Sequence, residues 1–437
     1  MPNPEQGAPL ERTAEITRAL IRFDTSNYGE GRANGEAEAA EYVAGLLRDL
    51  GLDPVLIDAA PGRRSVIARI AGADPALPAL VVHGHLDVVP AIAADWSVDP
   101  FEGVIKDGCI WGRGAVDMKN MDAMILAALE DILGSGRRPN RELIIAFFSD
   151  EEAGGELGSR YLVTHHPELF AGATEAISEV GGYSIQLGGT RAYLVQTGEK
   201  ALVWLRLKAT GRAGHGSQLN DDNAVTRIAE AVARIGRERW PITLTRTTEA
   251  LVTELARILQ LDLAAESPDA VVLAAGSTSR FLTATLRNTA NPTGLTAGYK
   301  VNVVPGHAEA LIDVRTLPGE EDAVIERIRE LAGDDIEVEV SLRDIGLETE
   351  FAGPLADAII ATLGRHDPGA PVIPYLLSGG TDNKALSRLG IRGVGFAPLR
   401  LPAELDFPSL FHGVDERVPL DALVFGKRVL TDLLLNY

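Results

Sequence analysis

Three consecutive acids, Asp150, Glu151 and Glu152, follow closely on the apolar run Leu143–Phe148. An apolar run of this length is typical of a strand that is buried on both faces. Carboxylates at the end of such a strand repel one another and lose solvation, so a positive group is needed to hold them together. A bound cation meets this requirement. One glutamate could then ligate the metal while the other moves protons.

Two earlier segments place candidate metal ligands in a similar way. The apolar run 79–82 leads into His85 and Asp87, and Asp117 stands directly before a helical pattern. Imidazole nitrogen and carboxylate oxygen are the ligands that zinc favours when no thiolate is available. The chain has a single cysteine, Cys109. The segments together therefore predict a metal site built from His, Asp and Glu.

The elements expected to position these residues alternate between helix and strand. From residue 37 to about 190, helical patterns alternate with short apolar runs, which indicates a sheet covered by helices on both faces. The helix after Asp117 is supported by apolar residues that recur on one face, namely Met118, Met121, Ile125, Leu129 and Ile132.

The pattern changes near residue 193. Apolar and mostly polar residues alternate in three segments, Val203–Ala209, Ala308–Val314 and Ile336–Leu342. Such alternation is typical of strands with one solvent-exposed face in a mostly antiparallel sheet. From about residue 344 the earlier pattern returns. We therefore predict one α/β domain from residues 1–192 and 344–437, interrupted by a smaller α/β domain of residues 193–343.

Length, charge and composition restrict the class of protein. A chain of 437 residues exceeds one average core, in agreement with two domains. The net charge of −21 argues against nucleic acid as a partner. No apolar run is long enough to span a membrane, and residues 1–11 lack the features of a secretion signal. With one cysteine, these features predict a cytoplasmic protein without a disulfide framework.

The motifs resemble those of the dinuclear zinc exopeptidase and deacylase family, which includes glutamate carboxypeptidase, aminoacylase, acetylornithine deacetylase and succinyl-diaminopimelate desuccinylase. The resemblance covers nearly the whole chain. It implies a zinc-exopeptidase-like catalytic domain with a mixed sheet, interrupted by a lid domain. Each of two metal ions would receive one His, one Glu and a shared Asp: His85, Glu179 and Asp117 for the first, and His412, Glu152 and Asp117 for the second.

The resemblance also implies roles for residues around the metals. Glu151 would be the general base, and the carboxylate of Asp87 would orient the ring of His85. The peptide bond after Asp117 would be cis. Taken alone, an Asp before a helix is more often only an N-cap, so the prediction for Asp117 depends on the other motifs.

In the lid, His215 would polarise the scissile carbonyl or stabilise its oxyanion, either in its own active site or in that of a partner subunit. Asn302 and Arg315 would grip the carboxylate of the substrate, to which a guanidinium fork is well matched. Taken alone, Arg315 would be read as half of a surface ion pair. Gly380 would bring the backbone close to the substrate. The segment 245–280 is longer than a minimal lid needs and receives no functional interpretation.

The predicted reaction is hydrolysis of an amide bond next to a free carboxylate, in a short peptide or an N-acyl amino acid. The cofactors would be two divalent ions, with zinc preferred over cobalt or manganese. A homodimer through the lid domain is expected. Two alternatives stay open: a two-metal hydrolase of non-peptide esters, and a catalytically idle relative that binds a ligand or partner.

Overall fold

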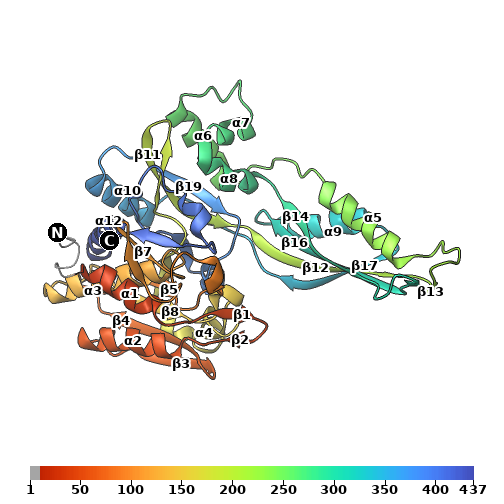
Figure 1. The fold of residues 1–437 in the computed structure, drawn as a ribbon. Coiled ribbons are helices and arrows are strands. Elements are labelled where there is room, and N and C mark those ends of the chain that lie inside the picture. The colour runs from red at the N-terminus through yellow and green to blue at the C-terminus, as the bar shows by residue number, and fades with distance from the viewer. Residues whose placement is uncertain (1–9) are drawn as a thin grey trace, which may run out of the picture. The chain divides into compact units, whose positions relative to one another are not determined.

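The computed structural model describes residues 10–437, which divide into two compact units (Figure 1). Unit 1 contains the described part of Met1–Gln196 together with Phe351–Ile373 and Thr381–Tyr437. Unit 2 contains Thr197–Glu350 and Pro374–Gly380. It thus starts and ends a few residues later than the predicted range 193–343 and includes one further segment. The strand β19 (Val372–Leu377) crosses that boundary as a continuous apolar run, so no change of pattern marks it.

Two sequence-based expectations concern the membrane. None of the described helices is both long and apolar enough to cross a bilayer. The expectation of no secretion signal rests mainly on residues 1–9, which lie outside the described part of the chain.

A mixed sheet forms the framework of unit 1, with the strand order β10-β11-β20-β9-β5-β8-β4-β3. The central strands β20, β9, β5 and β8 run parallel, whereas the flanking strands pair antiparallel. The bounds are β3 (Val55–Ala60), β4 (Arg63–Ile70), β5 (Ala79–His85), β8 (Leu143–Phe148), β9 (Ala173–Ser178), β10 (Ser184–Leu187), β11 (Thr190–Glu199) and β20 (Arg392–Gly395).

Helices cover both faces of this sheet. The strands β5 and β8 are buried along their whole length, and alternate residues of a strand point to opposite faces. Val81 and Phe148 share one core cluster with Leu162 and Leu386 from α4 and α11, whereas α2 packs on β4 and α3 packs on β5. The predicted fold class is confirmed. The bounds are α1 (Arg12–Ile21), α2 (Ala37–Asp49), α3 (Lys119–Gly134), α4 (Ser159–His165), α10 (Pro354–His366), α11 (Asn383–Ser387) and α12 (Leu420–Asn436).

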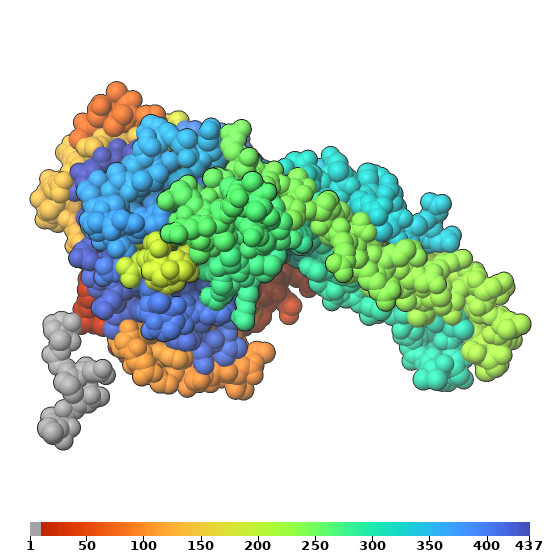
Figure 2. All heavy atoms as spheres, turned by 90° about the horizontal axis from the view of Figure 1, so that it is seen from above, coloured from red at the N-terminus to blue at the C-terminus, as the bar shows by residue number. Residues whose placement is uncertain are grey.

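Distant parts of the chain lie side by side in unit 1. The strand β21 (Arg417–Pro419) pairs with β7 (Cys109–Trp111), which in turn pairs with β6 (Val104–Lys106). On the face that Figure 2 shows, blue residues from the C-terminal part of the chain adjoin orange residues from its first third. A small hairpin is formed by β1 (Asn27–Gly29) and β2 (Arg32–Ala33). The C-terminal segment therefore returns to the part of the chain that comes shortly before α3.

An antiparallel sheet with the order β14-β16-β12-β17 forms the core of unit 2. Val203, Leu205 and Leu207 are buried, whereas the side chain of Trp204 on the other face is 45% exposed. Helices α5 and α9 supply the apolar residues that cover the buried face. The bounds are β12 (Ala201–Thr210), β14 (Thr289–Ala297), β16 (His307–Thr316), β17 (Ile336–Arg343), α5 (Ala224–Arg237) and α9 (Glu321–Ala332).

Smaller elements complete unit 2. The short strands β13 (Gly214–His215) and β15 (Val303–Val304) pair with each other. The strand β18 (Leu347–Glu348) pairs with the end of β11. The uninterpreted segment 245–280 contains the helices α6 (Arg246–Leu259) and α7 (Pro268–Leu273) and the start of α8 (Ser279–Leu282).

Candidate metal centre

The predicted metal ligands of unit 1 converge at the carboxyl edge of the parallel strands. His85 ends β5, Glu152 follows β8 and Glu179 follows β9. Because β5, β8 and β9 are parallel neighbours, the residues that follow them meet at one edge of the sheet. Asp117 comes from the loop before α3, and His412 from the loop before β21. The structure thus brings together all five residues that the resemblance assigned to two metal ions.

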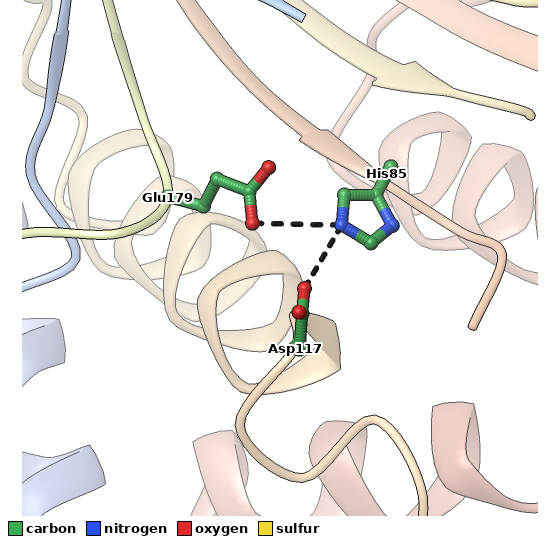
Figure 3. Close-up of side chains that lie close together, drawn as sticks. All are labelled: His85, Asp117 and Glu179. Atoms are coloured by element: carbon green, nitrogen blue, oxygen red, sulfur yellow. Dashed lines mark hydrogen bonds and ion pairs between the residues drawn. The ribbon is translucent and has the colours of Figure 1, made fainter. Parts of the chain in front are cut away.

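The first group contains His85, Asp117 and Glu179 (Figure 3). Nε2 of His85 lies 3.1 Å from Oδ1 of Asp117 and 3.5 Å from Oε2 of Glu179. Ligand atoms around a tetrahedral ion, each ~2.0–2.2 Å from the metal, are roughly 3.4 Å apart. All three residues are buried, so the distances and the donor types suit a divalent cation.

The second group contains Asp117, Glu152 and His412. Nε2 of His412 lies 3.2 Å from Oδ2 of Asp117 and 3.1 Å from Oε2 of Glu152. The two carboxylate oxygens of Asp117 therefore face different histidines. Met118, not Asp117, occupies the N-cap position of α3, so Asp117 is not a helix cap. The peptide bond between Asp117 and Met118 is cis, as the resemblance implied.

Crowded negative charge dominates the electrostatics of this centre. Burial, assisted by the charge of Glu179, raises the pKa of Glu151 well above its ordinary value. Burial, assisted by Asp117, also raises the pKa of Glu179 to about 8. Hydrogen bonds with Asp117 and Glu152 raise the pKa of His412 to about 11. Buried carboxylates that repel one another in this way are stabilised by a cation, which supplies the largest local charge when it binds.

The two adjacent glutamates differ in their surroundings. Glu152 belongs to the second ligand group, and its Oε1 also accepts a hydrogen bond from the backbone N–H of Val89 at 3.2 Å. Glu151 belongs to neither group, and its Oε2 lies 3.9 Å from Nε2 of His85. One glutamate therefore belongs to a candidate ligand group, and the other lies beside the ligands without belonging to either group.

Comparison with known proteins decides the family. The sequence profile of peptidase family M20/M25/M40 matches residues 81–436. The chain belongs to this family. A probable carboxypeptidase S-like protein of Dictyostelium discoideum is 28% identical over 389 residues, which cover 82% of this chain and 71% of the relative. Aminoacylase-1 of Homo sapiens is 28% identical over 408 residues, which cover 91% of this chain and 89% of the relative.

Solved structures agree with the family assignment. An M20 family metallo-carboxypeptidase of Sulfolobus solfataricus has the same fold, with a TM-score of 0.75 at 19% identity, and the match covers 98% of this chain and 99% of that one. The resemblance stated from the sequence motifs is confirmed. The M20 chain is a hydrolase of the peptidase and aminoacylase type, and its two residue groups are candidate ligands for metal ions.

The carboxylate of Asp87 does not make the contact with the ring of His85 that the resemblance implied. Nδ1 of His85 donates to the backbone carbonyl of Asp87 at 2.9 Å, whereas the Asp87 carboxylate is 3.7 Å away. A carbonyl only accepts, so Nδ1 carries the proton and Nε2 keeps the lone pair that a metal needs. The carboxylate instead accepts the backbone N–H groups of Glu151 and Glu152 at 3.0 and 3.1 Å. Those N–H groups begin a short helical turn and need an acceptor.

Sequence reasoning gave no role to Glu416, a buried carboxylate beside the centre. Glu416 is fully buried and accepts from Nη1 of Arg113 at 2.7 Å. It also accepts the backbone N–H groups of Gly114, Val116 and Asp117 at 3.0, 2.5 and 3.0 Å. Glu416 therefore fixes the loop that presents Asp117. It stands only four residues after His412, but nothing in the local sequence links it to a loop 300 residues away.

Replacing Glu416 with Gln should weaken metal binding by about 10–100-fold, the usual effect of removing the support of a ligand. The amide cannot accept all four hydrogen bonds and leaves Arg113 without its charged partner. Metal titration against a competing chelator measures the effect. Glu175→Gln is the matched control, because Glu175 also pairs with a buried arginine, Arg141, at 3.4 Å. Equal metal affinity in the two variants would contradict the prediction.

The predicted lid residues His215, Asn302, Arg315 and Gly380 all lie in unit 2. His215 is exposed and hydrogen-bonds through Nδ1 to Oγ of Ser217 at 2.7 Å, and the next residue, Gly216, donates its N–H to the carbonyl of Asn302 at 2.9 Å. Arg315 on β16 forms an ion pair with Asp313 at 2.7 Å, and its Nη1 lies 3.5 Å from the carbonyl of Ser378. Gly380 is two residues further along. The roles of these residues toward a substrate stay predictions.

Proposed function

We propose that this M20 chain hydrolyses amide bonds next to a free carboxylate, in short peptides or N-acyl amino acids. The observation that supports this most strongly is the different placement of Glu151 and Glu152. A ligand and a free base side by side are what metal-assisted hydrolysis needs. The names of the relatives, aminoacylase and carboxypeptidase, describe both substrate classes.

Two divalent cations, with zinc preferred over cobalt or manganese, would be held by His85, Glu179 and Asp117 and by His412, Glu152 and Asp117. When bound, such ions polarise a carbonyl and lower the pKa of water to about 7. The donor set of imidazoles and carboxylates is compatible with each of the three metals.

The residues of the chain then have distinct tasks. Glu151 takes a proton from the attacking water and returns it to the departing amine. His215 donates to the carbonyl oxygen, on which negative charge develops. Asn302, Arg315 and the backbone at Gly380 bind the carboxylate of the substrate and so orient the scissile bond.

Turnover of a mixed panel tests this proposal. Purified protein, analysed for metal, is incubated with N-acyl amino acids, with dipeptides and with the same compounds carrying an amidated carboxyl group. We expect two metal equivalents and cleavage only where the carboxylate is free. Cleavage of a chromogenic phosphate ester instead would favour the ester hydrolase, and metal-replete protein without turnover of either class would favour an idle relative.

Replacing Arg315 with Ala should raise KM for carboxylate substrates by about 10–100-fold, because a charge-assisted bidentate contact contributes roughly 1.5–3 kcal/mol. The metal content should stay unchanged. Arg206→Ala is the matched control, since Arg206 lies on the neighbouring strand and pairs with Glu309 at 3.0 Å at the surface. Initial-rate kinetics decide the matter, and an unchanged KM in Arg315→Ala would remove this residue from the substrate site.

A cytoplasmic location and a homodimer through the lid domain complete the proposal. The single cysteine supports a reducing compartment. The open face of the lid sheet exposes Trp204 and Leu311, which supports an interface there. Sedimentation velocity, performed with Trp204→Arg as the comparison, measures the oligomeric state directly.

A further inference from the structure

Arg63, at the start of β4, lies buried between two acids. Its Nε and Nη2 contact the Glu36 carboxylate at 3.0 and 2.8 Å, and Nη2 also donates to Oδ1 of Asp150 at 2.7 Å. The side chains of Glu36, Arg63 and Asp150 are 0%, 6% and 7% exposed. Buried charges of this kind persist only where each is paired and hydrogen-bonded, so Arg63 fixes both acids in place.

Asp150 stands directly before Glu151 and has a left-handed backbone, with φ of 67°. This conformation is uncommon for residues other than glycine and needs support from its surroundings. Oδ2 of Asp150 accepts the N–H of Leu157 at 2.8 Å, and its carbonyl accepts the N–H of Gly155 at 2.7 Å. The orientation of Asp150 therefore sets the direction in which the Glu151–Glu152 turn leaves β8.

Asn27 connects this arrangement to the other support of the turn. Its Nδ2 donates to Oδ2 of Asp87 at 2.9 Å and to Oδ1 of Asp150 at 3.1 Å. Asp87 holds the turn by accepting the N–H groups of both glutamates. Asp150 holds it because it is the residue from which the turn starts. Asn27 is 5% exposed, so its amide bridges two buried carboxylates that would otherwise repel each other.

We propose that Arg63 and Asn27 are positioning residues that fix the Glu151–Glu152 turn, and thereby both the general base and one ligand of the second metal ion. The side-chain hydrogen bonds of these residues go to acids that are not predicted metal ligands: Arg63 acts through Asp150, and Asn27 acts through Asp150 and Asp87. The assignment of Glu151 as base rests on the proposed function. The expected change in metal affinity, which acts through the ligand Glu152, does not depend on the reaction that the protein catalyses.

Arg63→Met tests the proposal, because Met keeps the apolar stem but removes the charged fork. We expect the affinity for the second metal equivalent to fall about 10–100-fold and kcat to fall by a similar factor, with KM nearly unchanged. Arg63→Lys should recover part of both losses, since one ammonium can serve one acid but not hold two in a fork. Chelator competition and steady-state kinetics measure these quantities.

Arg141→Met is the matched control. Arg141 lies two residues before the opposite end of β8 and pairs with Glu175 at 3.4 Å, with side chains 8% and 11% exposed. It should lose stability, measured by urea unfolding, but keep its metal affinity and kcat. If Arg63→Met and Arg141→Met bound metal with equal affinity, the proposal would be overturned. This outcome does not depend on whether the wild-type protein cleaves any tested amide.

Asn27→Ala decides the question if Arg63→Met does not fold. The change removes no charge and leaves Arg63 paired with both of its acids, so it should disturb folding less than Arg63→Met does. We expect the same direction of change in metal affinity and kcat, with a smaller size. Unchanged affinity for both metal equivalents in folded Asn27→Ala would overturn the proposal.

Discussion

Replacing Glu151 with Gln is expected to lower kcat by about 10²- to 10⁴-fold while the protein keeps both metal equivalents. Glutamine has nearly the same shape but cannot accept a proton at neutral pH. Because Glu151 lies outside both ligand groups, its loss should leave metal binding almost unchanged. Elemental analysis and steady-state kinetics on the same preparation measure the two quantities together.

Glu152→Gln is the matched comparison, since the two residues are adjacent and have the same side chain. Glu152 contacts His412 at 3.1 Å within the second ligand group, so its replacement should remove the second metal equivalent along with activity. A pattern in which Glu151→Gln loses metal and Glu152→Gln keeps it would reverse the two assignments. Near-normal turnover in Glu151→Gln would refute the mechanism.

The buried strands were the part of the fold most open to prediction. The run Leu143–Phe148 is a strand with the predicted bounds, buried along its whole length. The five predicted ligands lie at or next to the ends of elements, and several of those elements could be recognised from their local apolar patterns. The strand order that brings β5, β8 and β9 together is not contained in any local pattern. The strand order was not predicted; only the grouping of the ligands was, and that came from the resemblance to a known family.

The supports of the centre could not be predicted from the sequence. Arg113 and Glu416 are 303 residues apart, and Asn27 and Asp150 are 123 apart. Such contacts have no period and depend on the packed backbone, which sequence spacing does not describe. The contacts of Asp87 could not be predicted for the same reason. Its carboxylate accepts the N–H groups of Glu151 and Glu152, and its backbone carbonyl, in place of the carboxylate, accepts from Nδ1 of His85.

Replacing Asp117 with Asn should have the largest effect on metal content, because this residue alone belongs to both ligand groups. Its two oxygens lie 3.1 Å from His85 and 3.2 Å from His412. Asparagine offers one oxygen and no negative charge, and its NH₂ group would face a histidine or a cation. We expect the metal content to fall from two equivalents to one or fewer. Turnover should fall by at least as much as in Glu151→Gln.

Asp122→Asn provides the control for charge and burial. Asp122 lies in the first turn of α3 and is fully buried, and among the described residues neither of its carboxylate oxygens has a hydrogen-bond partner. Burial raises the pKa of Asp122 well above its ordinary value, so a neutral amide should be tolerated there. Both metal equivalents should remain in this variant. If Asp117→Asn also bound two ions tightly, the carboxylate would not be shared, and each ion would have to be held by one His and one Glu.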